Sequence, residues 1–167
     1  LALLGLLYLS FVWLLSGGDF LKGLKVSENV VKIEKYLRKI DHIIRLKGRE
    51  ILSDFNITIP QFTALQILIN NQGMTIGELS QKMALACSTI TDLIDRMERN
   101  GLVIRKKDEN DKRVVRIEVL SKGHEIVDKV LEKRIDYLNT KMKSLTEEQK
   151  VFLSEGLERL YDSMKDD

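Results

Sequence analysis

Residues 75–101, TIGELSQKMALACSTITDLIDRMERNG, are patterned as two short helices joined by a turn. Thr75 can cap the first helix, and Glu78 three residues later can complete a capping box. Each segment repeats apolar residues at three- and four-residue spacing, as the buried face of a helix requires. Those residues are Ile76, Leu79 and Met83, then Ile90, Leu93, Ile94 and Met97. Because Gly101 can supply the left-handed residue that ends the second helix, the stretch predicts a helix-turn-helix.

The outward face of the second helix is small and polar in its first half. It carries Cys87, Ser88, Thr89, Thr91 and Asp92. Side chains of this kind let a helix approach the base edges of a DNA major groove closely. We therefore expect the hydroxyl groups of Ser88, Thr89 and Thr91 to contact base edges or nearby phosphates. Asp92 would either accept a hydrogen bond from a cytosine amine or orient a basic neighbour, and we favour orientation.

Residues 102–120 predict a β-hairpin with a charged tip. LVIRKK is a short β-branched run, DENDKR is a charged turn, and VVRIEVL alternates apolar residues on one face. The segment from Arg96 to Arg116 holds eight basic and four acidic residues, a net charge of +4, whereas the whole chain carries +2. Positive charge is thus concentrated beside the groove-sized helix, as contact with DNA phosphates requires. We also expect Met74 and Thr75 to add a minimal third strand to this hairpin.

Within the hairpin, Arg113 is the residue that we expect to enter the minor groove, where arginine gains most over narrow A·T-rich stretches. Asp111 can hold its guanidinium by a charge-assisted hydrogen bond. Other basic residues should meet phosphates, which gives affinity without sequence choice. The remaining predicted DNA-contacting bases are Arg96, Arg105, Lys106, Lys107 and Lys112. The alternative is that DENDKR is only a solvated turn.

The segment LSQKMALACSTITDLIDRMERNGLVIRKKDENDKRVVRIEVLSKG resembles the core of the multiple-antibiotic-resistance regulator (MarR) family of bacterial winged-helix repressors. The strongest matches are DRMERNGLV, the wing motif D-x-R at Asp111–Arg113, and LSKG, where the family usually has LTxxG. Two residues depart from the family pattern. Asp92 stands where the family often has a basic or neutral residue, and Ala86 where a Ser or Thr often caps the recognition helix. We expect Ser88 to share that capping task.

The resemblance implies a mainly α fold with a small antiparallel β wing, from roughly Ser27 to the C-terminus. Residues 60–120 would form the winged helix-turn-helix lobe, and residues 27–55 and 121–167 the long dimerisation helices of a domain covering residues 21–167. Apolar stripes at both ends fit such arms. They consist of Val30, Ile33, Leu37, Ile40, Ile44 and Ile51, then Val127, Val130, Leu131, Ile135, Leu138 and Met142, and finally Leu153, Leu157, Leu160 and Met164.

Local signals place the starts of three helices. Pro60 can sit in the first turn of a helix that follows the N-terminal arm. We expect Ser121 to cap the C-terminal arm, and Thr146 with Gln149 to form a second capping box before the last helix.

In function, the resemblance implies a homodimeric repressor of a palindromic operator whose half-sites lie about one helical turn, roughly 10 base pairs, apart. A small aromatic or phenolic effector would bind where the long helices meet the DNA-reading lobe and release the repressor. No sequence feature identifies its pocket residues, and an activator is equally compatible. A winged helix that contacts only proteins is an alternative, but the basic wing argues against it.

Enzyme chemistry finds no support in the motifs: there is no phosphate-binding glycine loop, no HExxH and no paired cysteine motif, and we expect no cofactor. A single cysteine excludes an internal disulfide and favours a reducing cytoplasm. Cys87, at a helix start, could instead sense oxidants, which would make the protein a redox-sensing regulator. His42 and His124 fall on different helices, so surface positions are favoured over a zinc site.

Residues 1–20 do not match the rest, since Leu1 to Leu15 are apolar without a charge. The run is shorter than the about 20 residues of a transmembrane helix, and no positive leader precedes it. We interpret residues 1–20 as upstream sequence translated in frame, or as a tag-like artefact. Gly17-Gly18-Asp19, which GGAGGTGAT would encode, would then be a ribosome-binding sequence. An added interface helix and a membrane anchor are the alternatives.

Overall fold

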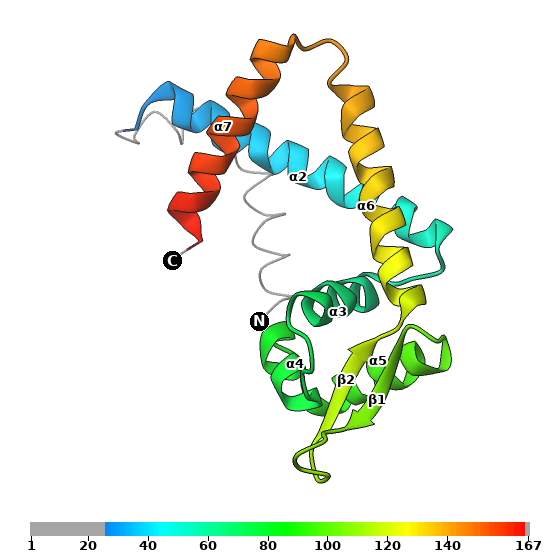
Figure 1. Ribbon diagram of the computed structural model, residues 1–167. Helices are drawn as coiled ribbons and strands as arrows, with labels where there is room; N and C mark the ends of the chain where they lie inside the picture. Colours follow the sequence, from blue (N-terminus) through cyan, green and yellow to red (C-terminus); the bar gives the residue numbers. More distant parts are fainter. Residues whose placement is uncertain (1–25, 166–167) are drawn as a thin grey trace. The chain divides into compact units, whose positions relative to one another are not determined.

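The structure, a computed structural model, describes residues 26–165 as a set of helices joined to a two-stranded sheet (Figure 1). In chain order the elements are α2 (Glu28–Asp54), α3 (Ile59–Asn70), α4 (Ile76–Met83), α5 (Cys87–Arg99), β1 (Val103–Lys107), β2 (Val115–Val119), α6 (Ser121–Lys141) and α7 (Glu147–Met164). The chain divides into two units between Ile44 and Arg45, within α2. The mainly α fold with a small antiparallel wing is confirmed, while residues 1–20, interpreted from the sequence as an artefact, lie outside the described residues.

The core of the second unit lies where α3, α4 and α5 meet the sheet and the start of α6. Its fully buried side chains include Leu65, Leu79, Ile90, Ile94, Met97, Val103, Ile117 and Val130. The apolar stripe predicted for α5 is therefore its buried face. The stripe predicted for α4 is buried at Leu79, and Ile76 and Met83 pack against the core at its edge.

Capping boxes start three of the helices. At α4, the Glu78 N–H donates to Thr75 Oγ1 at 3.3 Å, and the Thr75 N–H donates to Glu78 Oε2 at 2.7 Å. Thr146 and Gln149 make the same reciprocal pair before α7, so both predicted boxes are confirmed. A third box that sequence reasoning missed starts α3, where Thr58 and Gln61 bracket Pro60 in the first turn.

Neither Ser88 nor Ser121 caps a helix, contrary to the sequence-based expectation. The N-cap of α5 is Ala86 and that of α6 is Leu120, and neither makes a side-chain cap bond. The turn before α5 explains the first case, because Ala84 takes a left-handed conformation with φ 51° and reverses the chain early. Ser88 is thus placed inside the helix, beyond the cap position. Gly101, with φ 70°, ends α5 as predicted.

The sheet is a hairpin of β1 and β2, in which Arg105 pairs with Ile117 and Val103 with Val119. The expected third strand at Met74 and Thr75 is wrong. In the described chain it is reduced to one hydrogen bond, from the Ile117 N–H to the Met74 carbonyl at 2.8 Å. The extended run stops there because Thr75 is already the N-cap of α4.

A polar cluster holds the base of the wing. Arg116 donates through Nε to the Asp108 carboxylate and through Nη1 to the Gly73 carbonyl, the latter at 2.7 Å. Asp108 also accepts the backbone N–H groups of Asn110 at 2.9 Å and Asp111 at 3.1 Å. The hydrogen bond from Arg116, followed by those two backbone N–H groups, lowers the pKa of the Asp108 carboxyl from 3.8 to about 2. The turn between the strands is therefore organised around one ionised carboxylate.

The first turn of α6 packs closely against the segment that follows α5. Leu120 N–H donates to the Leu102 carbonyl at 2.9 Å, and Lys122 Nζ donates to the Asn100 carbonyl at 2.9 Å. A Cβ on Gly123 would lie 2.6 Å from the Leu102 carbonyl oxygen and 2.7 Å from Val119 Cγ1. Only a residue without a side chain fits this junction.

Gly123→Ala should lower the free energy of unfolding by about 1–3 kcal/mol, because the backbone of Leu102 or of α6 has to move. Gly77→Ala in α4 is the matched control, since its Cβ would meet only Thr75 Oγ1 at 3.9 Å. The control should be neutral or stabilising by up to about 1 kcal/mol. Urea denaturation of both variants measures the difference, and equal stabilities would contradict the assigned contact.

Asp108→Asn should destabilise the protein at neutral pH, and the effect should fade in acid. Because the pKa of Asp108 is lower in the folded state, its stabilisation is present above about pH 4 and is lost as the pH falls toward 2. Unfolding free energies of wild type and Asp108→Asn, measured from pH 6 downward, should converge in that window. Glu109→Gln, an exposed acid in the same turn, should show no such convergence. A difference that stays constant with pH would refute the role of the carboxylate.

Candidate nucleic-acid interface

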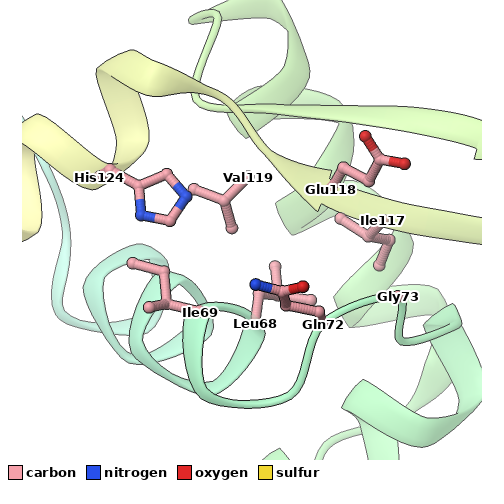
Figure 2. A pocket seen from close by; sticks show the side chains of 8 residues that line it. All are labelled: Leu68, Ile69, Gln72, Gly73, Ile117, Glu118, Val119 and His124. Carbon is pink, nitrogen blue, oxygen red and sulfur yellow. The ribbon is translucent and has the colours of Figure 1, made fainter.

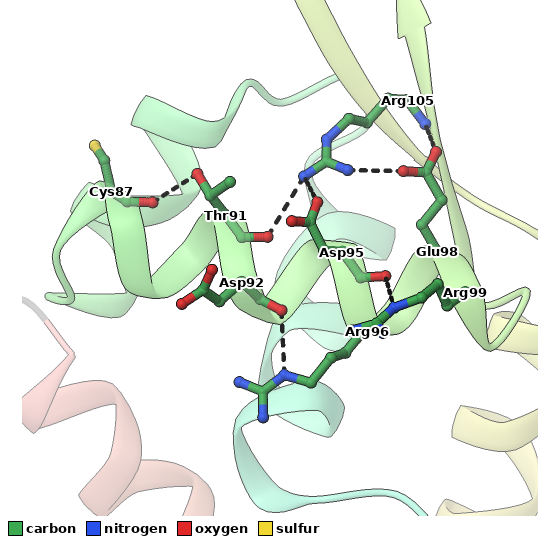
Figure 3. A network of polar contacts seen from close by, with 8 residues as sticks. All are labelled: Cys87, Thr91, Asp92, Asp95, Arg96, Glu98, Arg99 and Arg105. Atoms are coloured by element: carbon green, nitrogen blue, oxygen red, sulfur yellow. Dashed lines mark hydrogen bonds and ion pairs between the residues drawn. The ribbon is translucent and has the colours of Figure 1, made fainter.

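The face of α5 that was predicted to meet DNA is open to solvent. Cys87, Ser88, Thr89, Thr91 and Asp92 are all exposed, on the side opposite the buried stripe. The Thr91 hydroxyl donates to the Cys87 carbonyl at 2.9 Å (Figure 3). Its proton is thus used within the helix, and what Thr91 offers outward is an acceptor oxygen and a methyl group.

The backbone of Asp92 holds Arg96 along the helix. Arg96 Nε donates to the backbone carbonyl of Asp92 at 3.1 Å, as Figure 3 shows. The carbonyl oxygen, rather than the carboxylate, holds this arginine along the helix. Arg96 remains exposed near the end of α5.

Arg105 lies against α5 instead of pointing into solvent. Its Nη2 is 2.6 Å from Asp95 Oδ1, and its Nη1 donates to Glu98 Oε2 at 2.7 Å (Figure 3). The backbone N–H of Arg105 donates to the other Glu98 oxygen at 2.9 Å, and Nη2 also reaches the Thr91 carbonyl at 3.4 Å. Sequence reasoning assigned Arg105 to phosphates and missed both acids. Their three-residue spacing on one helix face was the available signal.

At the wing tip the expected pair is confirmed. Arg113 Nε and Nη2 donate to the two Asp111 oxygens, each at 3.0 Å, so the guanidinium is held in a fork. The arginine side chain is nonetheless 91% exposed. The hydrogen bonds from Arg113, first from its side chain and then from its backbone N–H, lower the pKa of the Asp111 carboxyl. The tip therefore presents a fixed, solvent-facing arginine.

The other basic residues of the wing differ in whether they are ion-paired. Lys106 forms an ion pair with Glu118 across the strands, although both side chains are about half exposed. Lys107 and Lys112 are exposed. These three lysines, with Arg96 and Arg113, are exposed and form the basic surface of the lobe. Arg105 and Arg116 are less exposed, and their guanidinium groups are bound to acids of the lobe itself.

Cys87 is exposed at the start of α5, and its Sγ lies 3.4 Å from Ser80 Oγ. Oxidation at this position would change the face that is predicted to meet DNA, and redox sensing stays a prediction. Among residues 26–165, no three or more His, Cys, Asp or Glu side chains are grouped so that they could hold a metal ion. None of the helices between residues 26 and 165 has the length and apolar composition of a membrane span.

A hollow of about 420 Å³ lies between α3, β2 and the first turn of α6 (Figure 2). Its apolar lining is Leu68, Ile69, Ile117 and Val119, and its polar lining includes Gln72, Glu118 and His124. His124 thus lines a hollow that sequence reasoning did not identify. The residues come from three separate elements, and so no local pattern marks it.

Comparison with known proteins places this geometry in a family. The sequence model described as "MarR family" matches residues 57–115. The HTH-type transcriptional regulator YsmB of Bacillus subtilis is 52% identical over 141 residues, which is 84% of this chain and 97% of YsmB. A MarR family protein from Bacillus stearothermophilus superposes with a TM-score of 0.76 at 46% identity, over 85% of this chain and 99% of that one.

The fold also matches that of a mutant of MepR from S. aureus bound to an oligodeoxyribonucleotide, with a TM-score of 0.64 over 79% of this chain and 97% of that one. At 22% identity this likeness concerns the fold alone. The chain matches YsmB and the Bacillus stearothermophilus protein along nearly the whole length of each, and these two matches establish its family. This chain belongs to the MarR family of winged helix-turn-helix transcriptional regulators.

Proposed function

We propose that this protein binds a palindromic operator in duplex DNA as a homodimer, represses transcription from it, and is released by a small-molecule effector. The observation that carries the proposal is the pairing, within one lobe, of a polar-faced helix and an arginine-tipped hairpin. The lobe joins them directly, since Arg105 of β1 binds α5.

The two parts suit two different grooves. A major groove admits a helix whose outer residues are short, and Ser88, Thr89 and Thr91 offer hydroxyl and methyl groups to base edges. Arg113 has the reach and exposure to enter a minor groove, where narrow A·T-rich stretches attract arginine most. Arg96, Lys106 and Lys112 would contact phosphates, which fix the register of the protein on the duplex.

The apolar faces of the outer helices support the dimer. In the described chain, α7 buries no residue, yet it carries large apolar side chains in solvent: Val151, Phe152, Leu153, Leu157, Tyr161 and Met164. α2 exposes Val30, Ile33, Tyr36, Leu37, Ile40, Ile43 and Leu46. Soluble monomers rarely expose patches of this extent, and a second copy would cover the same faces on both subunits. Such two-fold symmetry makes a palindromic site the natural target.

For the effector, the hollow between α3, β2 and α6 is a candidate site. Its volume falls within the roughly 300–1,000 Å³ range of ligand pockets. A small aromatic molecule could lie on Ile69 and Val119 and hydrogen-bond to Gln72 or His124. A ligand there would touch Gly73 and Ile117, the residues through which the wing is tied to the chain before α4. Occupancy could therefore shift the lobe toward a state that does not fit DNA.

Selection of bound sites from random duplex DNA, followed by binding at several salt concentrations, tests DNA recognition. The selected sites should be palindromic with half-sites roughly 10 base pairs apart, and affinity should fall steeply with salt. A protein that prefers no selected site over random duplex would overturn the proposal.

Arg113→Ala should weaken binding to the selected site by about 1–3 kcal/mol and relax the preference at its minor-groove positions. Lys112→Ala is the neighbouring control, because a phosphate contact weakens binding to all duplexes alike and lowers the salt slope by about 0.9. Electrophoretic or fluorescence titrations measure both. If Arg113→Ala affects selected and random duplexes equally, the arginine does not read the groove.

Leu157→Glu should disrupt the dimer, because an unpaired carboxylate buried in the interface costs about 3–5 kcal/mol. The dissociation constant should rise by more than roughly 100-fold. Leu157→Met, which keeps an apolar side chain of similar volume at the same position, is the control and should leave the dimer intact. Analytical ultracentrifugation distinguishes the outcomes, and a wild type that stays monomeric at micromolar concentration would exclude the assignment.

A further inference from the structure

Arg105 is the most heavily engaged basic side chain of the lobe. Its guanidinium binds two carboxylates that lie one helical turn apart on α5, at 2.6 and 2.7 Å, and it also reaches a carbonyl of the same helix. Its own backbone N–H donates to Glu98, so the strand as well as the side chain is fastened. Each contact joins β1 to α5, and these are the two elements that carry the predicted DNA contacts.

A phosphate contact does not fit this geometry. The Arg105 side chain is 25% exposed, against 91% for Arg113, and both of its terminal nitrogens already donate to oxygens of the lobe. A phosphate would have to displace Asp95 and Glu98, and would then leave two carboxylates close to DNA. Lys107 and Lys112 are exposed and offer positive charge nearby without that cost.

Arg105 lies far from the tip of the hairpin, so a small rotation at its contact with α5 produces a large displacement of the tip. Asn110 in the turn lies five residues beyond Arg105, so the tip is at most about 16 Å from Arg105 at the strand rise. A tilt of the hairpin by about 10° at Arg105 would move the tip by up to about 3 Å, which is the length of a hydrogen bond. Small rotations at this point would therefore separate Arg113 from a groove edge while α5 stayed in place.

We propose that Arg105 is a positioning residue: by binding Asp95 and Glu98 it fixes the wing to α5, so that both meet adjacent grooves of one duplex at a set separation. The inference rests on the proposed DNA-binding function. It assigns Asp95 and Glu98 a favourable role in DNA recognition, although both carry negative charge.

The expected effect of removing these two acids makes the proposal testable. If electrostatics alone operated, removing acidic charge beside DNA would tighten binding to every duplex. If the acids hold Arg105 in place, removing them weakens binding to the selected site. Glu109→Gln is the control for the loss of an acidic charge as such, because Glu109 is an exposed acid of the wing turn outside the cluster.

The experiment measures affinity for the duplex selected by the wild type and for random duplex, at several salt concentrations. Asp95→Asn with Glu98→Gln, and separately Arg105→Lys, should each lose at least about tenfold on the selected duplex and little on random duplex. Lysine keeps the charge but cannot bridge two carboxylates as the planar guanidinium does. The salt slope should be unchanged in Arg105→Gln, and Glu109→Gln should bind as tightly as wild type or more so.

Three results would overturn the proposal. The first is tighter binding by the Asp95→Asn, Glu98→Gln variant. The second is a salt slope lowered by about 0.9 in Arg105→Gln, which is the mark of a lost phosphate contact. The third is an equal loss on selected and random duplexes, which is what a general loss of folded protein would give. A wild type without any selected site would instead remove the proposed function itself, before a variant is measured.

Discussion

Helix α5 packs into the core along one side and is exposed to solvent along the other, and this amphipathic pattern orients the whole lobe. Ile90, Leu93, Ile94 and Met97 are all 5% exposed or less. Burying such side chains is worth about 1.5–3 kcal/mol each, so together they fix the rotation of the helix about its axis. The polar residues between them must then point toward solvent. The direction of the face that we propose to contact DNA is thus set by the core, and no contact among its polar residues is needed to orient it.

Features set by neighbours in sequence were accessible without the structure. The capping boxes at Thr75 and Thr146, the left-handed Gly101 and the Asp111–Arg113 pair each involve residues at most three apart. Their geometry follows from local backbone rules, and all four match what the sequence predicts. The long apolar stripe of α5 belongs with them, because its spacing alone defines a face.

Features set by chain reversals were not accessible in this way. A count of positive charge treats Arg105, Arg113 and Arg116 as equals, yet only Arg113 faces solvent almost completely. Arg116 reaches the Gly73 carbonyl from 43 residues away, a pairing that no periodicity encodes. The serines fail for a related reason, since whether Ser88 or Ser121 caps a helix depends on the turn before it. Thr75 shows the same competition, because its role as a cap prevents it from extending the sheet.

The bare junction at Gly123 bears on how a signal could travel through the protein. With no side chain between α6 and the Leu102 carbonyl, no rotamer is available there to absorb a displacement. Lys122 and Leu120 donate hydrogen bonds to the same short segment, which directly follows α5. We therefore expect a shift of α6 along or about its axis to displace the carboxyl end of α5 as well. The close packing at Gly123 would make this connection between the two helices stiff.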